Sequence, residues 1–169
     1  MEEIASDHGS ASLPFNSPLE TGIRSVGILV EVFPKAFDLQ RLVAFDYLVV
    51  HTGDIGGPNS LHPELPMRTA ELLVRRGLVE RGLLLMASRK LVCRQATSEG
   101  LYFSAGEFAE TFYASLTSPY LIALRVRAKW VAQRFANVSE SDFREFMTAA
   151  FGQWIEQFQI AERSLAGEL

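Results

Sequence analysis

The fold of this chain is decided by residues 68–104, which read RTAELLVRRGLVERGLLLMASRKLVCRQATSEGLYFS. The first part, residues 68–88, carries aliphatic side chains at intervals of three and four, the spacing that gathers them on one side of a helix. Gly77 lies in the middle of this segment, where glycine lowers helix propensity. We therefore expect two helices, residues 68–76 and 78–88, hinged at Gly77.

The second part of this stretch predicts a hairpin. Residues 91–95 and 101–104 form short β-prone runs, and the segment between them includes Thr-Ser-Glu-Gly at residues 97–100, which suits a turn. Helices followed by a two-stranded wing are the order of elements in a winged helix, a variant of the helix-turn-helix architecture.

Two further helices are expected before this stretch. In residues 21–33 the apolar side chains recur at helical spacing, and Pro34 then stops the helix. Asp38 can cap a second helix that ends near Thr52, because its carboxylate accepts a hydrogen bond from a free backbone N–H of the first turn.

Two amphipathic helices are expected at the C-terminal end, one over about residues 119–136 and one that opens with the capping-box pattern of residues 139–142. The second carries an aromatic stripe, which completes the core in the favoured interpretation and anchors a partner protein in the alternative. The stripe consists of Phe143, Phe146, Phe151, Trp154 and Phe158.

The predicted fold is therefore mainly α, with a winged-helix-like core of three or four helices plus a two-stranded wing, followed by two C-terminal amphipathic helices. We expect residues 1–17 to be a mobile N-terminal tail, because they show little periodicity. Residues 18–169 are expected to form a single domain, with the C-terminal helices as its extension.

Composition favours a packed protein of the cytoplasm. The chain has 169 residues, of which 48% are hydrophobic, and a single cysteine, Cys93, which cannot form an internal disulfide. The first residues are acidic where a signal peptide is basic, and no apolar run reaches the roughly 18 residues of a membrane span. We expect a soluble, cytoplasmic protein without membrane contact.

Charge is distributed unevenly along the chain. Residues 67–94 contain seven basic and two acidic residues, a formal charge of plus 5, so the remainder must carry minus 9 to give the total of minus 4. Such segregation marks a face for DNA phosphates or for an acidic protein partner, or else a solvated helix face. The candidates for partner or DNA binding are Arg68, Arg75, Arg76, Arg81, Arg89 and Lys90.

A glycine-rich loop over residues 53–60, extended by Pro63 and Pro66, adds Asp54 and the flanking His51 and His62 to the candidate contact residues, because loops of about a dozen residues are often functional. The spacing of the two histidines matches no standard metal pattern, and the glycines lack the Gly-Lys-Ser/Thr of a phosphate loop. We therefore expect no catalytic residue, no metal and no cofactor. A hydrolase centred on these three residues is the third hypothesis.

Four stretches of the sequence, residues 15–25, 38–43, 46–54 and 71–86, resemble the middle component of bacterial ABC-three-component systems, of its second type. The resemblance covers roughly residues 15–100. It implies a small subunit encoded between an ABC-type or SMC-like ATPase and a third component, in a system that defends against phages or plasmids, with Lamassu as the nearest well-known example.

The resemblance implies a non-catalytic adaptor that docks on the SMC-like or ABC ATPase and links or restrains a nuclease-type effector, with DNA contacted through the complex. The alternative is a stand-alone winged-helix DNA-binding regulator. Residues 78–88 weaken that alternative, since a mostly apolar helix offers few hydrogen bonds to base edges.

Overall fold

The computed structural model describes residues 17–63, 68–152, 160, 163–164 and 167, and of residues 68–73 it describes the backbone. These parts of the chain form six α-helices, a short 3-10 turn and one small antiparallel sheet. The helices are α1 (Pro18–Val32), α2 (Leu39–Val50), α3 (Arg68–Ser88), α4 (Ala109–Ser115), α5 (Pro119–Phe135) and α6 (Glu140–Phe151). The strands are β1 (Phe37–Asp38), β2 (Val92–Thr97) and β3 (Gly100–Ala105), and the turn is η1 (Thr52–Ile55).

Both predicted helices of the N-terminal half are confirmed, with their caps. Ser17 and Glu20 form a capping box at the start of α1, where Pro18 occupies the first turn and needs no hydrogen-bond partner. The Asp38 carboxylate accepts from the Arg41 N–H at the start of α2. Nearly all of α2 is buried, so this helix forms the centre of the core.

The predicted hinge at Gly77 is wrong, because α3 continues through it as one helix of 21 residues. A glycine inside a helix costs only about 1 kcal/mol, which the packing of the inner side of α3 offsets. The glycine that matters for packing is Gly82, where a Cβ atom would lie 2.7 Å from the backbone nitrogen of Gly22. α1 and α3 therefore cross with their backbones in close contact.

The predicted hairpin is confirmed as β2 and β3, which pair from Val92 with Ala105 to Thr97 with Gly100. Sequence reasoning missed β1, which adds a third strand by pairing Phe37 with Phe103. The sheet order is β1-β3-β2. A two-residue strand leaves no alternation to read in the sequence, so only tertiary pairing defines it.

The two C-terminal helices are confirmed as α5 and α6, whereas the short α4 between the hairpin and α5 was not predicted. Ser139 accepts from the Asp142 N–H at the start of α6. Of the aromatic stripe, Phe143 is buried, and Phe146 and Phe151 are half-buried against the core. Trp154 and Phe158 lie outside the described residues, as does the predicted tail apart from Ser17.

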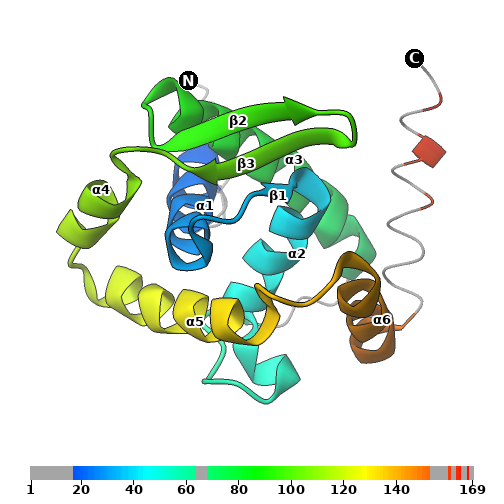
Figure 1. Ribbon diagram of the computed structural model, residues 1–169. Helices are drawn as coiled ribbons and strands as arrows, with labels where there is room; N and C mark the ends of the chain where they lie inside the picture. The colour runs from blue at the N-terminus through cyan, green and yellow to red at the C-terminus, as the bar shows by residue number, and fades with distance from the viewer. Residues whose placement is uncertain (1–16, 64–67, 153–159, 161–162, 165–166, 168–169) are drawn as a thin grey trace, which may run out of the picture.

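The helices are arranged around α1 and α2, which form the middle of the molecule, with α3 packed on one side of them and α5 on the other (Figure 1). The sheet covers one end of this arrangement, and α6 lies beside α2. The outer sides of α3 and of α5 consequently face away from each other.

Candidate functional site

A buried carboxylate, Asp46 of α2, lies between two arginines from neighbouring helices. Arg24 of α1 binds one carboxylate oxygen through Nε at 2.9 Å, and Arg75 of α3 binds the other through Nη1. Asp46 is fully buried, which opposes its ionisation, but the two guanidinium groups outweigh this and hold its pKa below the usual range. This cluster, which we call the Asp46 cluster, connects three helices of the core.

The Asp46 cluster corrects the prediction that Arg75 is a surface anchor. Arg75 is only 6% exposed, and its guanidinium points inward to Asp46 and lies over the Tyr47 ring. Arg75 therefore stabilises the fold, since removing one partner of a buried ion pair leaves an uncompensated charge. The sequence contained a signal for this cluster, because Asp46 interrupts the otherwise apolar run of α2.

A third buried arginine, Arg41, connects α2 to the junction between α5 and α6. Its Nη2 donates to the carbonyls of Phe135 and Val138 at 2.9 and 3.0 Å, and its Nη1 pairs with Glu140 at 3.2 Å. The guanidinium also lies 3.8 Å from the centroid of the Phe143 ring. Sequence reasoning missed this role, because carbonyl acceptors leave no signal in a sequence.

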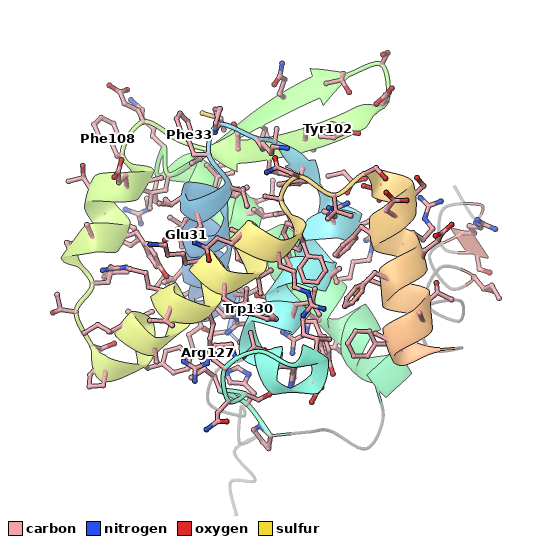
Figure 2. The ribbon with its side chains drawn as sticks, turned by 60° about the horizontal axis from the view of Figure 1, so that its bottom comes forward. Glu31, Phe33, Tyr102, Phe108, Arg127 and Trp130 are labelled. Atoms are coloured by element: carbon pink, nitrogen blue, oxygen red, sulfur yellow. The ribbon has the colours of Figure 1, made fainter. Side chains whose placement is uncertain are left out.

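The loop after α2 is held firmly in place. The Thr52 hydroxyl donates to the Pro58 carbonyl at 2.7 Å, and Arg127 and Arg134 of α5 donate to loop carbonyls. Trp130 of α5 covers Gly57 so closely that a Cβ atom there would lie 2.8 Å from the indole (Figure 2). The loop is thus part of the packed structure on the α5 side.

The three polar residues of this loop lie near one another but do not converge on one point. His51 is buried and stacks on Tyr47, while the Tyr47 hydroxyl donates to Asp54 at 3.2 Å. His62 hydrogen-bonds the Tyr120 hydroxyl at 2.9 Å. Burial, followed by the nearby Arg24 and Arg75 charges, lowers the pKa of His62 to about 4. His62 is therefore neutral at neutral pH.

This arrangement gives no support to the hydrolase hypothesis. Within the described ranges, no three His, Cys, Asp or Glu side chains are grouped so that they could hold a metal ion. The burial of His51 also keeps it from any surface contact in this conformation, contrary to its selection as a contact residue. Asp54 is exposed and His62 is half-buried.

The remaining basic candidates lie on the outer side of α3 and at the base of the hairpin. Arg81, Arg89 and Lys90 are exposed, and Arg76 is half-buried and 3.8 Å from Glu80. Lys90 has a left-handed backbone, with φ of 61°, where the chain turns from α3 into β2. The side chain of Arg68 lies outside the described part of the chain.

A groove of about 600 Å³ lies between the outer side of α3 and the hairpin. Its apolar members include Leu84 of α3 and Leu101 of β3, both of which are partly exposed to solvent. Charged side chains of both signs surround them: Asp38, Arg76, Glu80, Glu99, Arg144 and Arg163. We call the outer side of α3 together with this groove the α3 face.

The described residues define a small, mainly helical protein in which the buried charges hold helices together and the exposed groove combines apolar and charged groups. The chain belongs to the ABC-three component (ABC-3C) system Middle Component 2 family, whose model matches residues 14–157. This match confirms the resemblance found in residues 15–100 and extends it beyond the hairpin. No curated protein and no solved structure gives a significant match.

Family membership places the chain in a three-component system, which is consistent with a subunit of a defence system and implies partner components. The family's description names no reaction. In the described part of the chain, none of the helices has both the length and the apolar character needed to cross a bilayer.

Proposed function

We propose that this chain is a non-catalytic, cytoplasmic adaptor of a bacterial anti-phage or anti-plasmid complex, which docks on an SMC-like or ABC-type ATPase and links or restrains a nuclease-type effector. The family match supports the setting. The observation that carries the adaptor role is the chemistry of the α3 face, which suits contact with protein better than contact with DNA.

The proposed core is a winged helix. The order α1, β1, α2, α3, β2, β3 and the sheet order β1-β3-β2 are those of winged-helix domains, with β2 and β3 as the wing. In the DNA-binding members of this class, the third helix enters the major groove. The outer side of α3 therefore discriminates between the two proposed functions.

The exposed side of α3 carries large aliphatic groups. Val74 is 63% exposed and Leu84 43% exposed, and Gly77 between them has no side chain. Base edges are recognised through hydrogen bonds, which these residues cannot supply. Apolar side chains surrounded by charges of both signs instead match the anatomy of a protein interface, with a dry centre and a polar rim.

The test measures binding of the chain to the purified ATPase that is encoded beside it. Leu84→Asp places a charge in the centre of the α3 face and should weaken binding at least about tenfold, the effect of losing an interface hot spot. Arg76→Glu combined with Arg81→Glu should also weaken binding of the ATPase, because it reverses two charges at the edge of the α3 face. Glu145→Arg on α6, an exposed charge reversal outside the groove, is the matched control. Unchanged binding by Leu84→Asp would contradict the assignment of this face.

The alternative function, a stand-alone DNA-binding regulator, rests on a separate observation. Arg81, Arg89, Lys90 and Arg94 are all exposed near the end of α3 and the start of the wing, where they could contact phosphates. If the isolated chain binds duplex DNA through these residues, its affinity should fall steeply as the salt concentration rises. Lys90→Glu with Arg94→Glu should then reduce the slope of log affinity against log salt concentration by about two.

A further inference from the structure

The most exposed aromatic side chains in the described part of the chain do not line the groove of the α3 face. Phe33, which follows α1, is 66% exposed, and Phe108, which precedes α4, is 51% exposed (Figure 2). Phe33 lies four residues before Phe37, and Phe108 lies five residues after Phe103. Because Phe37 pairs with Phe103 in antiparallel strands, Phe33 and Phe108 follow the same end of the sheet. Exposed aromatics of this size are typical of interaction sites.

The outer side of α5 adds a row of exposed apolar side chains. Ile122 and Val126 are one turn apart and both exposed, and Lys129 and Gln133 follow on the same stripe. The stripe extends about 16 Å along the helix axis, from the rise of 1.5 Å per residue. It ends where Lys129 and Gln133 meet Phe33 at a groove.

This groove, of about 440 Å³, separates the end of α1 from the end of α5. Its lining includes small side chains, Ala132 and Ala136, which leave room for an inserted apolar group. Its charged residues are Glu31, Lys35 and Lys129, so positive charge is in excess. The Lys35 ammonium group donates to the Ala136 carbonyl at 2.9 Å, which fixes one cation at the rim.

We propose that this surface, the α5 face, is a second docking site that takes an amphipathic helix of a protein partner. Aliphatic side chains of that helix would cover Phe33, Phe108 and the α5 stripe, and an acidic side chain would meet Lys35 and Lys129. A helix is the proposed occupant because the row of side chains on α5 forms a ridge, and such a ridge packs into the groove between the ridges of another helix. The inference rests on the proposed adaptor function.

A second copy of this chain suits the α5 face less well. In a two-fold interface with the two α5 stripes antiparallel, Lys129 of one copy would lie opposite the Ile122 end of the other, and the stripe has no acidic residue to pair with it. The outer side of α5 and the outer side of α3 lie on different sides of α1 and α2, so two different partners can be held at once (Figure 1). This geometry gives a middle component the means to join its neighbours.

The test uses the full chain and the two proteins encoded beside it, the ATPase and the third component, each purified as a probe. Phe33→Asp combined with Phe108→Asp should weaken binding of the third component at least about tenfold and leave binding of the ATPase unchanged. Leu84→Asp on the α3 face is the matched control and should show the reverse selectivity. Both sites are exposed, so the melting temperatures should stay close to that of the parent chain.

A photo-crosslinking amino acid at position 33 identifies the occupant directly. Crosslinks to a helix of the probe that Phe33→Asp with Phe108→Asp weakens would support the proposal. Crosslinks to residues 1–16 of the same chain or to a second copy would overturn it. Binding of both probes without any effect of the double variant overturns this inference alone, whereas binding of neither probe overturns the adaptor function and this inference with it.

Discussion

The two sides of α3 use the same kinds of residues for different purposes. Arg75 and Arg76 are neighbours in the sequence, but Arg75 points inward to the buried Asp46, while Arg76 points outward to the rim of a groove. A change on the inner side should therefore destabilise the fold, and a change on the outer side should weaken partner binding and leave the stability nearly unchanged. The charge of a residue does not distinguish these roles. They depend on whether its position on the helix faces the core or the solvent.

The largest effect is expected from Asp46→Ala. This change leaves Arg24 and Arg75 buried without their shared carboxylate, which should lower the free energy of unfolding by about 3–5 kcal/mol. Urea denaturation followed by circular dichroism measures it. Glu145→Ala removes an exposed carboxylate of α6 and should cost less than about 1 kcal/mol. Similar losses for the two variants would contradict a special role of the Asp46 cluster.

The two central glycines of α3 should respond in opposite directions. Gly82→Ala places a Cβ against the backbone of Gly22 and should destabilise the protein by about 1–3 kcal/mol. Gly77→Ala meets only the flexible end of Arg81, at 3.4 Å, and should stabilise it by about 0.5–1 kcal/mol. Thermal denaturation compares the two. A loss of stability from Gly77→Ala would restore the idea of a hinge.

Much of the fold followed from periodicity, and the exceptions have physical causes. Helices α1, α2, α5 and α6 and the hairpin carry caps, stop signals or repeating apolar residues that the sequence displays. The continuity of α3 depends on packing that outweighs one glycine. β1 and α4 are too short to show a repeat. The candidate site followed less well, because burial of Arg75 and His51 depends on which elements meet, and the sequence does not contain that information.

The pH dependence of stability separates buried from exposed groups in a further way. The pKa of His62 is lowered from 6.5 to about 4, so the unfolded chain takes up a proton more readily than the folded protein in that interval. Stability should thus decrease as pH falls from 6.5 to about 4. Because the pKa of Asp46 is also lowered, a further loss of stability begins as the pH falls toward the usual carboxyl range. His62→Gln should reduce the slope of the free energy of unfolding against pH between pH 6.5 and 4.5. An unchanged slope would contradict the lowered pKa of His62.

The smallest effect on stability is expected from the outer side of α3. Arg76→Glu combined with Arg81→Glu replaces partly exposed charges and should change the free energy of unfolding by less than about 1 kcal/mol. Denaturation in urea checks this beside the Asp46→Ala series. A loss above 3 kcal/mol would mean that both sides of α3 serve the fold and that the contrast between them is false.

The central claim is that this chain joins other components, and its most direct test is the mass of the complex it forms. The chain is co-expressed with the two proteins encoded beside it, and size exclusion with mass measurement identifies what elutes together. The adaptor account predicts one stoichiometric complex that contains all three. Elution of the chain alone, with salt-sensitive binding to duplex DNA, would contradict it and favour the DNA-binding regulator.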